Sequence, residues 1–328
     1  MKQIDTLLID LFMDLLANAE NSGTCGPNLK WLLTDNGVLV ITGKGKMNDY
    51  IYFDGAPWYK YDIKRIIIGD GATTIGGYAF AYCSSLTSVT IPNSVTTIEW
   101  FAFLGCKALT SVTIPNSITE IGYSAFGGCS SITSVTIPNS VTKIGDLAFS
   151  SCSALTSVTI PNSVTTIGEH AFAGCSALTS VTIPNSVTKI SDWAFSGCRS
   201  LKNFTFGSGL RSIGQEAFSD CINITQISSE AVVPPICGIN ALDDINKWNC
   251  KLFVPKANID AYKQAPQWKE FFFIDGTTGI TNTVYNNSGL ADVYTIDGTK
   301  RLSKASTDEI NALPKGVYIV NGKKIIIK

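Results

Sequence analysis

Short segments in which apolar and polar residues alternate recur along most of the chain. In the first clear copy, Val89 and Ile91 each follow a hydroxyl-bearing residue, the period-2 pattern of a strand buried on one face. Pro92 has no backbone N–H to donate to a strand ladder, so it ends the strand, and the polar residues behind it predict a turn. A second short segment, extended or helical, then returns the chain to the same apolar core.

This segment repeats every 23 residues. The string SVTIPNSVT occupies residues 88–96 and returns, with one Val-to-Ile change, from Ser111, Ser134, Ser157 and Ser180. Each unit ends on an Ala-Phe pair, with the phenylalanines at Phe80, Phe103, Phe126, Phe149, Phe172, Phe195 and Phe218. A cysteine follows each of them three residues later, at Cys83, Cys106, Cys129, Cys152, Cys175, Cys198 and Cys221. Seven aligned Phe–Cys pairs exclude chance and define a repeat protein.

The repeat predicts the fold. One unit of 23 residues cannot enclose its own apolar face, but stacked units bury it continuously, with one parallel strand in each coil. We therefore expect an α/β repeat solenoid of 23-residue coils with a parallel sheet. Its strands should begin near Ile63, Leu86, Leu109, Ile132, Leu155, Leu178, Leu201 and Ile224. After an irregular insertion, Lys251–Pro255 is predicted as a ninth strand.

The repeat also carries a family resemblance. The pattern IxxIGxxAFxxCxxLTSVTIPNSV over residues 63–255 resembles the leucine-rich repeats of BspA-like bacterial surface proteins. The stretch that begins SGTCGPNLKWLL resembles the segment preceding such repeats in that family. The resemblance implies a curved solenoid, secretion or surface display, and adhesion to macromolecules of a host or a neighbouring cell.

Both ends of a solenoid need caps, because terminal coils expose core. Residues 23–62 are predicted as an N-terminal β cap, with strands at 29–33 and 38–42 around an Asp-Asn-Gly turn at 35–37. Four aromatic residues are available either to cover the first coil or to form a ligand shelf: Trp31, Trp58, Tyr59 and Tyr61. The solenoid is assigned to residues 63–275, and its last coil is closed by a helix over 257–272, interrupted at Pro266.

Residues 280–328 have a different character. Two runs of alternating apolar residues carry Asp297-Gly298 and Asn321-Gly322 turns, which predicts a small all-β module. The tail resembles C-terminal modules of secreted Bacteroidetes proteins, some of which are sorting signals. A plain β appendage is the alternative.

Residues 1–22 combine a signal-like pattern with an obstacle to export. Lys2, the apolar runs behind it and Ala-Asn-Ala at 17–19 resemble a secretory signal with its cleavage site. Asp5, Asp10 and Asp14 oppose this interpretation, because an acidic residue at the centre of an inserted helix costs about 2.5–3.5 kcal/mol. Two interpretations stay open: an atypical export signal, which the rest of the chain favours, or an amphipathic helix that docks on the N-terminal cap.

Composition narrows the function. The 25 basic and 26 acidic residues leave a net charge of −1, whereas a nucleic-acid binder needs a basic face. No apolar run approaches the roughly 18 residues that suggest a membrane span. His170, the one histidine, is predicted as a solvated turn residue, which argues against histidine catalysis and multi-histidine metal sites. We predict no catalytic residue, no cofactor and no metal, and therefore no enzyme.

The ten cysteines fall into two groups. The seven periodic ones share one coil position and are expected to point inward as small apolar fillers, since parallel Cβ vectors in adjacent coils disfavour bridges. Cys25, Cys237 and Cys250 are the better disulfide candidates, and the pair of Cys237 with Cys250 is favoured.

Two surfaces are candidates for partner binding. The strand face presents columns of Ser and Thr, which are either simply solvated or suit a repetitive ligand, with ice as one variant. The position before each Ala-Phe pair diverges between repeats, and aromatic residues on a rigid scaffold are typical interface anchors. Its members are Tyr78, Trp100, Phe101, Tyr123, His170 and Trp193. Packing over the groove between coils is the structural alternative for them.

The sequence thus predicts a non-enzymatic, secreted or cell-surface protein that binds an extracellular protein or glycan through its solenoid. It predicts neither a nucleic-acid partner nor a membrane span. The alternative is a structural spacer or self-association module without a dedicated ligand.

Overall fold

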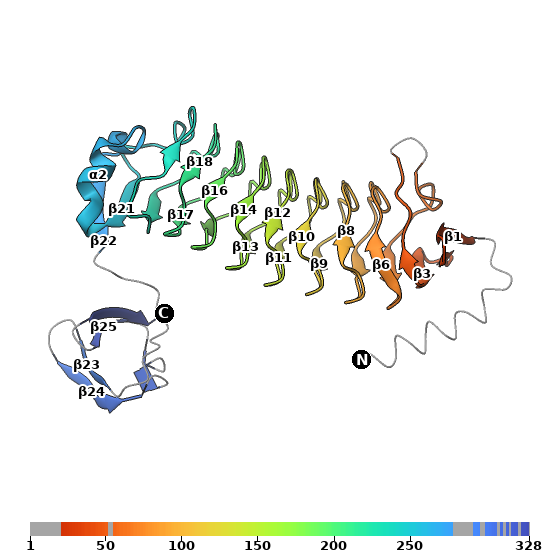
Figure 1. Cartoon of the computed structure of the whole chain (residues 1–328), viewed down its shortest axis with the longest axis horizontal. Helices are drawn as coiled ribbons and strands as arrows, with labels where there is room; N and C mark the ends of the chain where they lie inside the picture. The colour runs from red at the N-terminus through yellow and green to blue at the C-terminus, as the bar shows by residue number, and fades with distance from the viewer. Residues whose placement is uncertain are drawn as a thin grey trace.

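The computed structural model describes residues 21–51, 55–277, 291–295, 299–306, 309–310, 313–314, 316–320 and 323–327. It is a parallel-strand solenoid in which successive coils stack in a single row (Figure 1). The predicted solenoid with 23-residue coils is confirmed, because strand partners in neighbouring coils differ by 23 residues, as in the pairing of Val135 with Val158. The signal-like segment with Asp5, Asp10 and Asp14 lies outside the described residues.

The N-terminal cap is antiparallel. β1 (Ser22–Gly26), β2 (Leu29–Leu33) and β3 (Val38–Gly43) form two hairpins, and the turn predicted at 35–37 connects the second. β3 also pairs in parallel with β5 (Arg65–Ile68), so the cap passes directly into the first sheet of the solenoid. Gly37 has a φ of +80°, the left-handed backbone that favours glycine in such a turn.

What we call the first sheet is a face built from one strand of each coil. After β5 its strands are β7 (Ser88–Thr90), β9 (Ser111–Thr113), β11 (Ser134–Thr136), β13 (Ser157–Thr159), β15 (Ser180–Thr182), β17 (Asn203–Phe206), β19 (Gln226–Ser229), β21 (Lys251–Pro255) and β22 (Phe273–Thr277). Its hydrogen-bonded ladder is interrupted between β7 and β9 and between β13 and β15. The strands begin two residues later than predicted, because Leu86 and its equivalents still belong to a turn: the Leu86 N–H donates to the Cys83 carbonyl. β22 was not predicted; it follows the capping helix and pairs in parallel with β21.

The second segment of each coil is extended rather than helical. It forms a second parallel sheet of nine strands, in the order β20-β18-β16-β14-β12-β10-β8-β6-β4. Their bounds are β4 (Gly45–Lys46), β6 (Ala72–Ile75), β8 (Thr97–Ile98), β10 (Glu120–Ile121), β12 (Lys143–Ile144), β14 (Thr166–Ile167), β16 (Lys189–Ile190), β18 (Ser212–Ile213) and β20 (Ile236–Cys237). Two sheets face each other across one core, and the helical part of the predicted α/β solenoid is found at its C-terminal cap.

A column of phenylalanines occupies that core. The rings of Phe126 and Phe149 are 5.6 Å apart with 5° between their planes, and both side chains are fully buried. The cysteine column stands beside it, and its thiols are donors as well as apolar fillers. Cys129 Sγ, for example, donates to the Phe103 carbonyl at 3.2 Å, and five further coils repeat this bond. Each bond links a coil to its predecessor.

All ten cysteines are free thiols. The predicted disulfide between Cys237 and Cys250 is therefore wrong, and so is the disulfide role considered for Cys25. Cys25 is buried in β1 of the N-terminal cap, whereas Cys237 lies in β20, the strand at the C-terminal end of the second sheet. The thiol of Cys237 donates to the carbonyl of Pro235, and the thiol of Cys250 donates to the carbonyl of Lys251.

The C-terminal cap consists of short helical pieces. η2 (Lys256–Asn258) leads into α2 (Ile259–Gln264), and η3 (Trp268–Glu270) follows a break around Pro266, as predicted. Tyr262 and Trp268 are fully buried over the last coils. Their polar groups are satisfied by backbone, since the Tyr262 hydroxyl donates to the Ala231 carbonyl and the Trp268 indole N–H to that of Pro235.

The C-terminal residues form a separate antiparallel sheet. Its order is β24 (Lys300–Ala305), β23 (Ala291–Thr295), β25 (Gly316–Val320) and β26 (Lys323–Ile327). Its small core contains Val293, Ala305, Ile310, Tyr318 and Val320. A small β module is therefore present, while its predicted turn residues at 297–298 and 321–322 lie outside the described residues.

Candidate functional site

The corner before each Ala-Phe pair is held by backbone hydrogen bonds that run from coil to coil. The Tyr78 N–H donates to the Trp100 carbonyl at 3.2 Å, and the Phe101 N–H to the Tyr123 carbonyl at 2.9 Å. One residue per coil adopts a left-handed backbone here although it is not glycine, with φ between +48° and +58°. These residues are Tyr78, Phe101, Ser124, Leu147, His170, Trp193 and Glu216. A side chain at this corner is therefore held in a fixed direction by its coil neighbours.

The six predicted site residues belong to two neighbouring columns, and the structure brings four of them together. Tyr78 stacks on Phe101 at 4.7 Å between ring centroids and meets Trp100 edge-on at 5.3 Å. Phe101 in turn meets Tyr123 edge-on at 5.0 Å. We call Tyr78, Trp100, Phe101 and Tyr123 the aromatic cluster.

His170 and Trp193 form a separate pair. Their rings stack at 5.1 Å, both are half-buried, and the Trp193 indole N–H donates to Glu216 Oε2 at 3.0 Å. These contacts connect successive coils. They correspond to the structural alternative for this position, in which the side chains pack over the groove between coils. In the aromatic cluster, by contrast, Trp100 and Tyr123 keep 37% and 44% of their surface exposed.

Two glycines allow exposed aromatic rings to pack directly against the backbone. A Cβ on Gly77 would lie 2.8 Å from the Trp100 indole, and one on Gly105 would lie 2.8 Å from the Tyr82 ring. Each ring therefore lies directly on backbone of the adjacent coil. Tyr82 was missed as a site residue, although the sequence carried a signal: it stands where other coils have Gly105, Gly128, Gly174 or Gly197.

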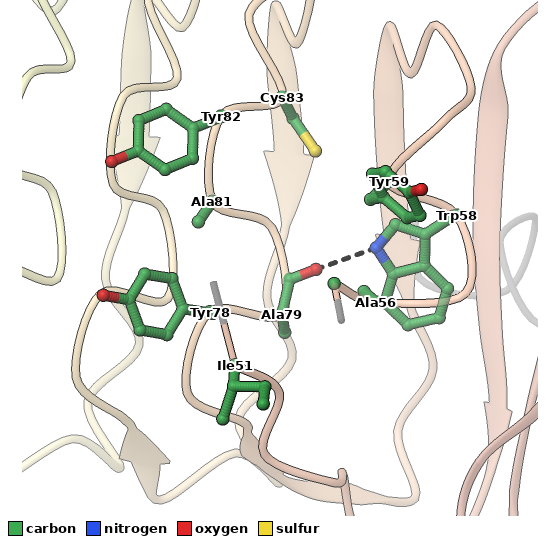
Figure 2. A pocket seen from close by; sticks show the side chains of 10 residues that line it. Ile51, Ala56, Trp58, Tyr59, Tyr78, Ala79, Ala81, Tyr82 and Cys83 are labelled. Atoms are coloured by element: carbon green, nitrogen blue, oxygen red, sulfur yellow. Dashed lines mark hydrogen bonds between the residues drawn. The ribbon is translucent and has the colours of Figure 1, made fainter. Parts of the chain in front are cut away.

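A small pocket opens beside the aromatic cluster, with a volume of about 100 Å³. Figure 2 shows Tyr78 and Tyr82 on one side of it and Trp58 and Tyr59 on the other. Trp58 is fully buried and donates its indole N–H to the Ala79 carbonyl at 2.8 Å, whereas Tyr59 is 70% exposed. We call this the tyrosine pocket. Of the aromatic residues expected at the N-terminal cap, Trp31 and Trp58 thus cover the first coil, while Tyr59 faces solvent.

The tyrosine pocket is lined by aromatic and small uncharged residues. Cys83 is its one thiol, and burial raises the pKa of that thiol from 9.0 to about 12, so it stays protonated and a poor nucleophile at neutral pH. The described residues contain no group of His, Cys, Asp or Glu arranged to hold a metal ion. Aromatic rings held in place around a hollow are suited to contact another molecule.

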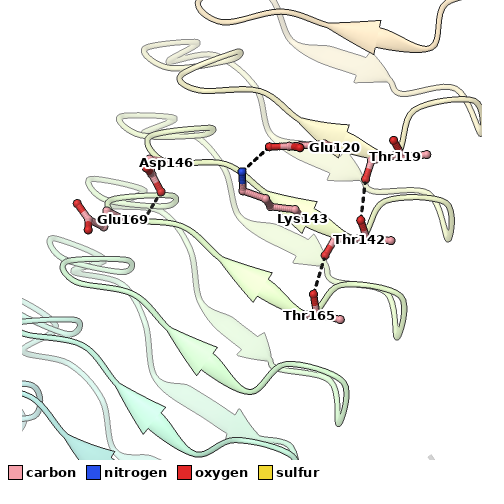
Figure 3. A network of polar contacts seen from close by, with 7 residues as sticks. All are labelled: Thr119, Glu120, Thr142, Lys143, Asp146, Thr165 and Glu169. Carbon is pink, nitrogen blue, oxygen red and sulfur yellow. Dashed lines mark hydrogen bonds and ion pairs between the residues drawn. The ribbon is translucent and has the colours of Figure 1, made fainter.

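The polar surfaces of the solenoid are bonded internally. On the second sheet, Thr142 and Thr165 each donate a hydroxyl hydrogen bond to the threonine carbonyl one coil earlier, and Lys143 pairs with Glu120 at 2.6 Å (Figure 3). On the first sheet, Thr156 Oγ1 donates to the Thr133 carbonyl at 3.1 Å. Both sets of contacts tie successive coils together.

Gly105 and Gly128 allow a matched test of the contact between Tyr82 and the backbone of the next coil. Gly105 and Gly128 both have a φ of +69°, but only at Gly105 would a Cβ meet Tyr82; at Gly128 the nearest neighbour is 3.5 Å away. We expect Gly105→Ala and Gly128→Ala each to lower the free energy of unfolding by about 1–2 kcal/mol, the cost of a left-handed alanine. Only Gly105→Ala should also weaken partner binding, because only it displaces Tyr82. Denaturant titration and a binding assay on both variants check this, and equal binding by the two would contradict it.

Coils with one strand in each of two parallel sheets, a repeated aliphatic and phenylalanine core, and a rigid outer surface define a leucine-rich-repeat type of scaffold. The sequence model of the BspA type leucine rich repeat region matches residues 56–179, 143–241 and 166–291, in six copies. The chain belongs to this family, a repeat scaffold. No curated protein matches it.

Among solved structures, one from Bacteroides ovatus shows a similar fold, and two further leucine-rich repeat proteins match with lower TM-scores. A leucine-rich repeat protein from Bacteroides ovatus is 24% identical, with a TM-score of 0.52 over 77% of this chain and 76% of its own. A leucine rich cell surface protein from Faecalibacterium prausnitzii is 21% identical, with a TM-score of 0.37 over 65% of this chain and 96% of its own. A leucine rich repeat protein from T. pallidum is 28% identical, with a TM-score of 0.41 over 55% of this chain and 91% of its own.

Within the described chain, no helix has the length and apolar character to cross a bilayer.

Proposed function

We propose that this chain is a non-enzymatic binding protein of the cell surface or the extracellular space, and that its aromatic cluster contacts a protein or a glycan. The observation that carries the proposal is the state of Trp100, which is 37% exposed yet held by Gly77, Tyr78 and Phe101. A rigid, exposed tryptophan loses little conformational freedom when a partner covers it, and such residues dominate interface energies.

Family membership supports this proposal. The family is a repeat scaffold, and the Faecalibacterium prausnitzii relative is described as a cell surface protein. Adhesion to a host or to neighbouring cells, which the sequence resemblance implies, is part of the proposal. The small net charge of −1 favours a partner recognised by shape and apolar contact rather than by charge.

The test compares two exposed tryptophans at opposite ends of the solenoid. Wild-type chain is screened against immobilised matrix proteins and glycans, and the binding partner found is titrated against Trp100→Ala and Trp248→Ala. We expect Trp100→Ala to weaken binding about 30-fold, equivalent to about 2 kcal/mol at a central anchor. Trp248, which is 71% exposed near the C-terminal cap, is the matched control and should leave binding within twofold. The reverse order of effects would refute the assignment.

The second candidate function is self-assembly without a dedicated ligand. β22 is the last strand of its sheet among the described residues, and three exposed aromatics lie at its start: Trp248, Phe272 and Phe273. Trp248 and Phe272 stack at 5.0 Å. The outer edge of a sheet is a template for pairing with a second copy. Light scattering decides: oligomers that grow with concentration and dissociate in Trp248→Ala favour assembly, and a monomer at all concentrations excludes it.

A further inference from the structure

A groove lies near the middle of the solenoid, where β9, β11 and β13 end side by side (Figure 1). Its volume is about 650 Å³, and it is lined by residues of three equivalent Thr-Ile-Pro-Asn segments, at 113–116, 136–139 and 159–162. We call it the asparagine groove. None of its lining residues carries a formal charge, so it is not suited to a charged polymer.

The strand ladder fixes the spacing along the asparagine groove. Thr136, at the end of β11, is paired with Thr113 of β9 on one side and with Thr159 of β13 on the other. Strands paired in this way stand about 4.8 Å apart, so equivalent groups recur at that step over about 9.6 Å. A ligand that lies along the stack of coils therefore meets the same set of groups three times.

The asparagine groove has an apolar floor and a polar rim. Ile114, Ile137 and Ile160 are buried, as are the prolines that follow them. The threonine and the asparagine of each segment are exposed. A threonine hydroxyl donates and accepts one set of hydrogen bonds, and an asparagine carboxamide offers two donors and an acceptor. Each coil thus presents both donors and acceptors beside an apolar surface.

The polar rim is not bonded internally, in contrast to the hydroxyl columns elsewhere on the solenoid. Within the part of the chain that the structure describes, the side chains of Asn116, Asn139 and Asn162 form no hydrogen bond. The hydroxyls of the three threonines form none either. In the next coil, by contrast, Asn185 Oδ1 accepts the Ser208 N–H at 2.8 Å. The three coils of the groove therefore carry polar groups that water or a ligand must satisfy.

A linear, uncharged polysaccharide matches this arrangement. Its hydroxyls both donate and accept, as the carboxamides and threonine hydroxyls do. The C–H faces of its rings suit the apolar floor, and each ring of an extended chain advances by roughly one strand spacing. A peptide strand fits less well, because strand addition uses backbone groups along one strand edge, whereas the groups here are side chains that follow one another across the strands.

We propose that the asparagine groove binds an extended, uncharged β-linked glucan that lies across β9, β11 and β13, with one sugar unit over each coil. Thr136 and Asn139 hold the central unit. The groove is separate from the aromatic cluster, so this inference goes beyond the proposed function and does not depend on Trp100.

The experiment titrates the full chain with cellohexaose by isothermal titration calorimetry. Maltohexaose is the reference, since it contains the same glucose units in a curved chain. We expect saturable binding of cellohexaose and binding of maltohexaose that is weaker by about tenfold or more, because a curved chain contacts fewer coils. Within the series from glucose to cellohexaose, affinity should rise up to the trisaccharide and then level off, since three coils line the groove.

Two variants test the central coil. Asn139→Ala and Thr136→Val should each weaken cellohexaose binding about fivefold, the loss of about one net hydrogen bond. Asn185→Ala is the matched control, because it changes the same repeat position outside the groove, and it should leave binding within about twofold. All three residues are exposed, so circular dichroism should show an unchanged fold.

Each outcome is decisive. Absence of cellohexaose binding at millimolar concentration overturns the inference, and so does binding that is unchanged in both Asn139→Ala and Thr136→Val. Equal binding of cellohexaose and maltohexaose also overturns it. If Trp100→Ala abolishes cellohexaose binding while Asn139→Ala does not weaken it, the groove inference fails and the proposed function stands. If Asn139→Ala weakens cellohexaose binding and Trp100→Ala affects no partner, the inference holds and the role of the aromatic cluster fails.

Discussion

Phe126→Ala is expected to lower the free energy of unfolding by about 3–5 kcal/mol, the usual cost of truncating a buried phenylalanine. The ring is fully buried between Phe103 at 5.3 Å and Phe149 at 5.6 Å, with planes within 5° of parallel. Because each coil contacts only its neighbours, a cavity in the middle of the array weakens two coil interfaces together. Urea titration followed by circular dichroism measures the loss as a lower midpoint.

Thr133→Ala is the matched control in the same coil region. Thr133 is exposed, and its backbone carbonyl, which the substitution preserves, accepts the hydrogen bond from Thr156. Its effect should stay within about 0.5 kcal/mol. Phe126→Leu should recover most of the stability, since it keeps much of the apolar volume. A midpoint for Phe126→Ala no lower than that of Thr133→Ala would show that the phenylalanine column is not the core.

The protein is also expected to unfold in alkali well before pH 12. Burial raises the pKa of Cys175 from 9.0 to about 12, and it raises the pKa values of Cys25, Cys83, Cys237 and Cys250 to about 12 as well. The neutral thiol is thus the form that folding favours. The stability that the neutral thiols contribute to the fold is complete below pH 9. It is lost as the pH rises from about 9 to about 12, because the thiols of the unfolded chain release their protons first.

The expected size of this effect is large. In that window each such thiol adds one proton to the difference between the folded and the unfolded chain, so the effects of the five thiols on the pH dependence of stability combine. Urea midpoints should be flat from pH 6 to 8 and should fall steeply above pH 9. Cys175→Ala removes one titrating group, and its pH dependence above pH 9 should be shallower by one proton. A slope identical to that of the wild type would contradict the assigned role of Cys175.

The candidate site was only partly predictable. Tyr78, Trp100, Phe101 and Tyr123 diverge visibly from a uniform repeat, so their position in the sequence singled them out. Tyr82 also diverges, but its importance depends on Gly105 in the next coil, a contact between coils that no single repeat displays. Likewise, His170 and Trp193 have the same sequence position as Tyr78, yet Glu216 and their mutual stacking make them coil-to-coil contacts.

The disulfide prediction failed for a related reason. The spacing between Cys237 and Cys250 in the sequence says nothing about the direction of their side chains. In the fold, each thiol points to nearby backbone, the carbonyls of Pro235 and Lys251. The same lack of directional information concealed the hydrogen bonds of the periodic cysteines, which look like plain apolar fillers until the neighbouring coil is in place.

By itself, the sequence determined the class of fold. A 23-residue unit with a single apolar face cannot bury that face alone, and stacking similar coils over a shared core buries it continuously. The sequence also determined the positions of Phe126 and its equivalents in that core. Tertiary structure alone decided that the second segment of each coil is a strand, that β22 extends the first sheet, and that Tyr59, Tyr78 and Tyr82 gather around one pocket. Those outcomes depend on contacts between coils, and the energy of such contacts depends on which residues face each other across the stack rather than on their order along the chain.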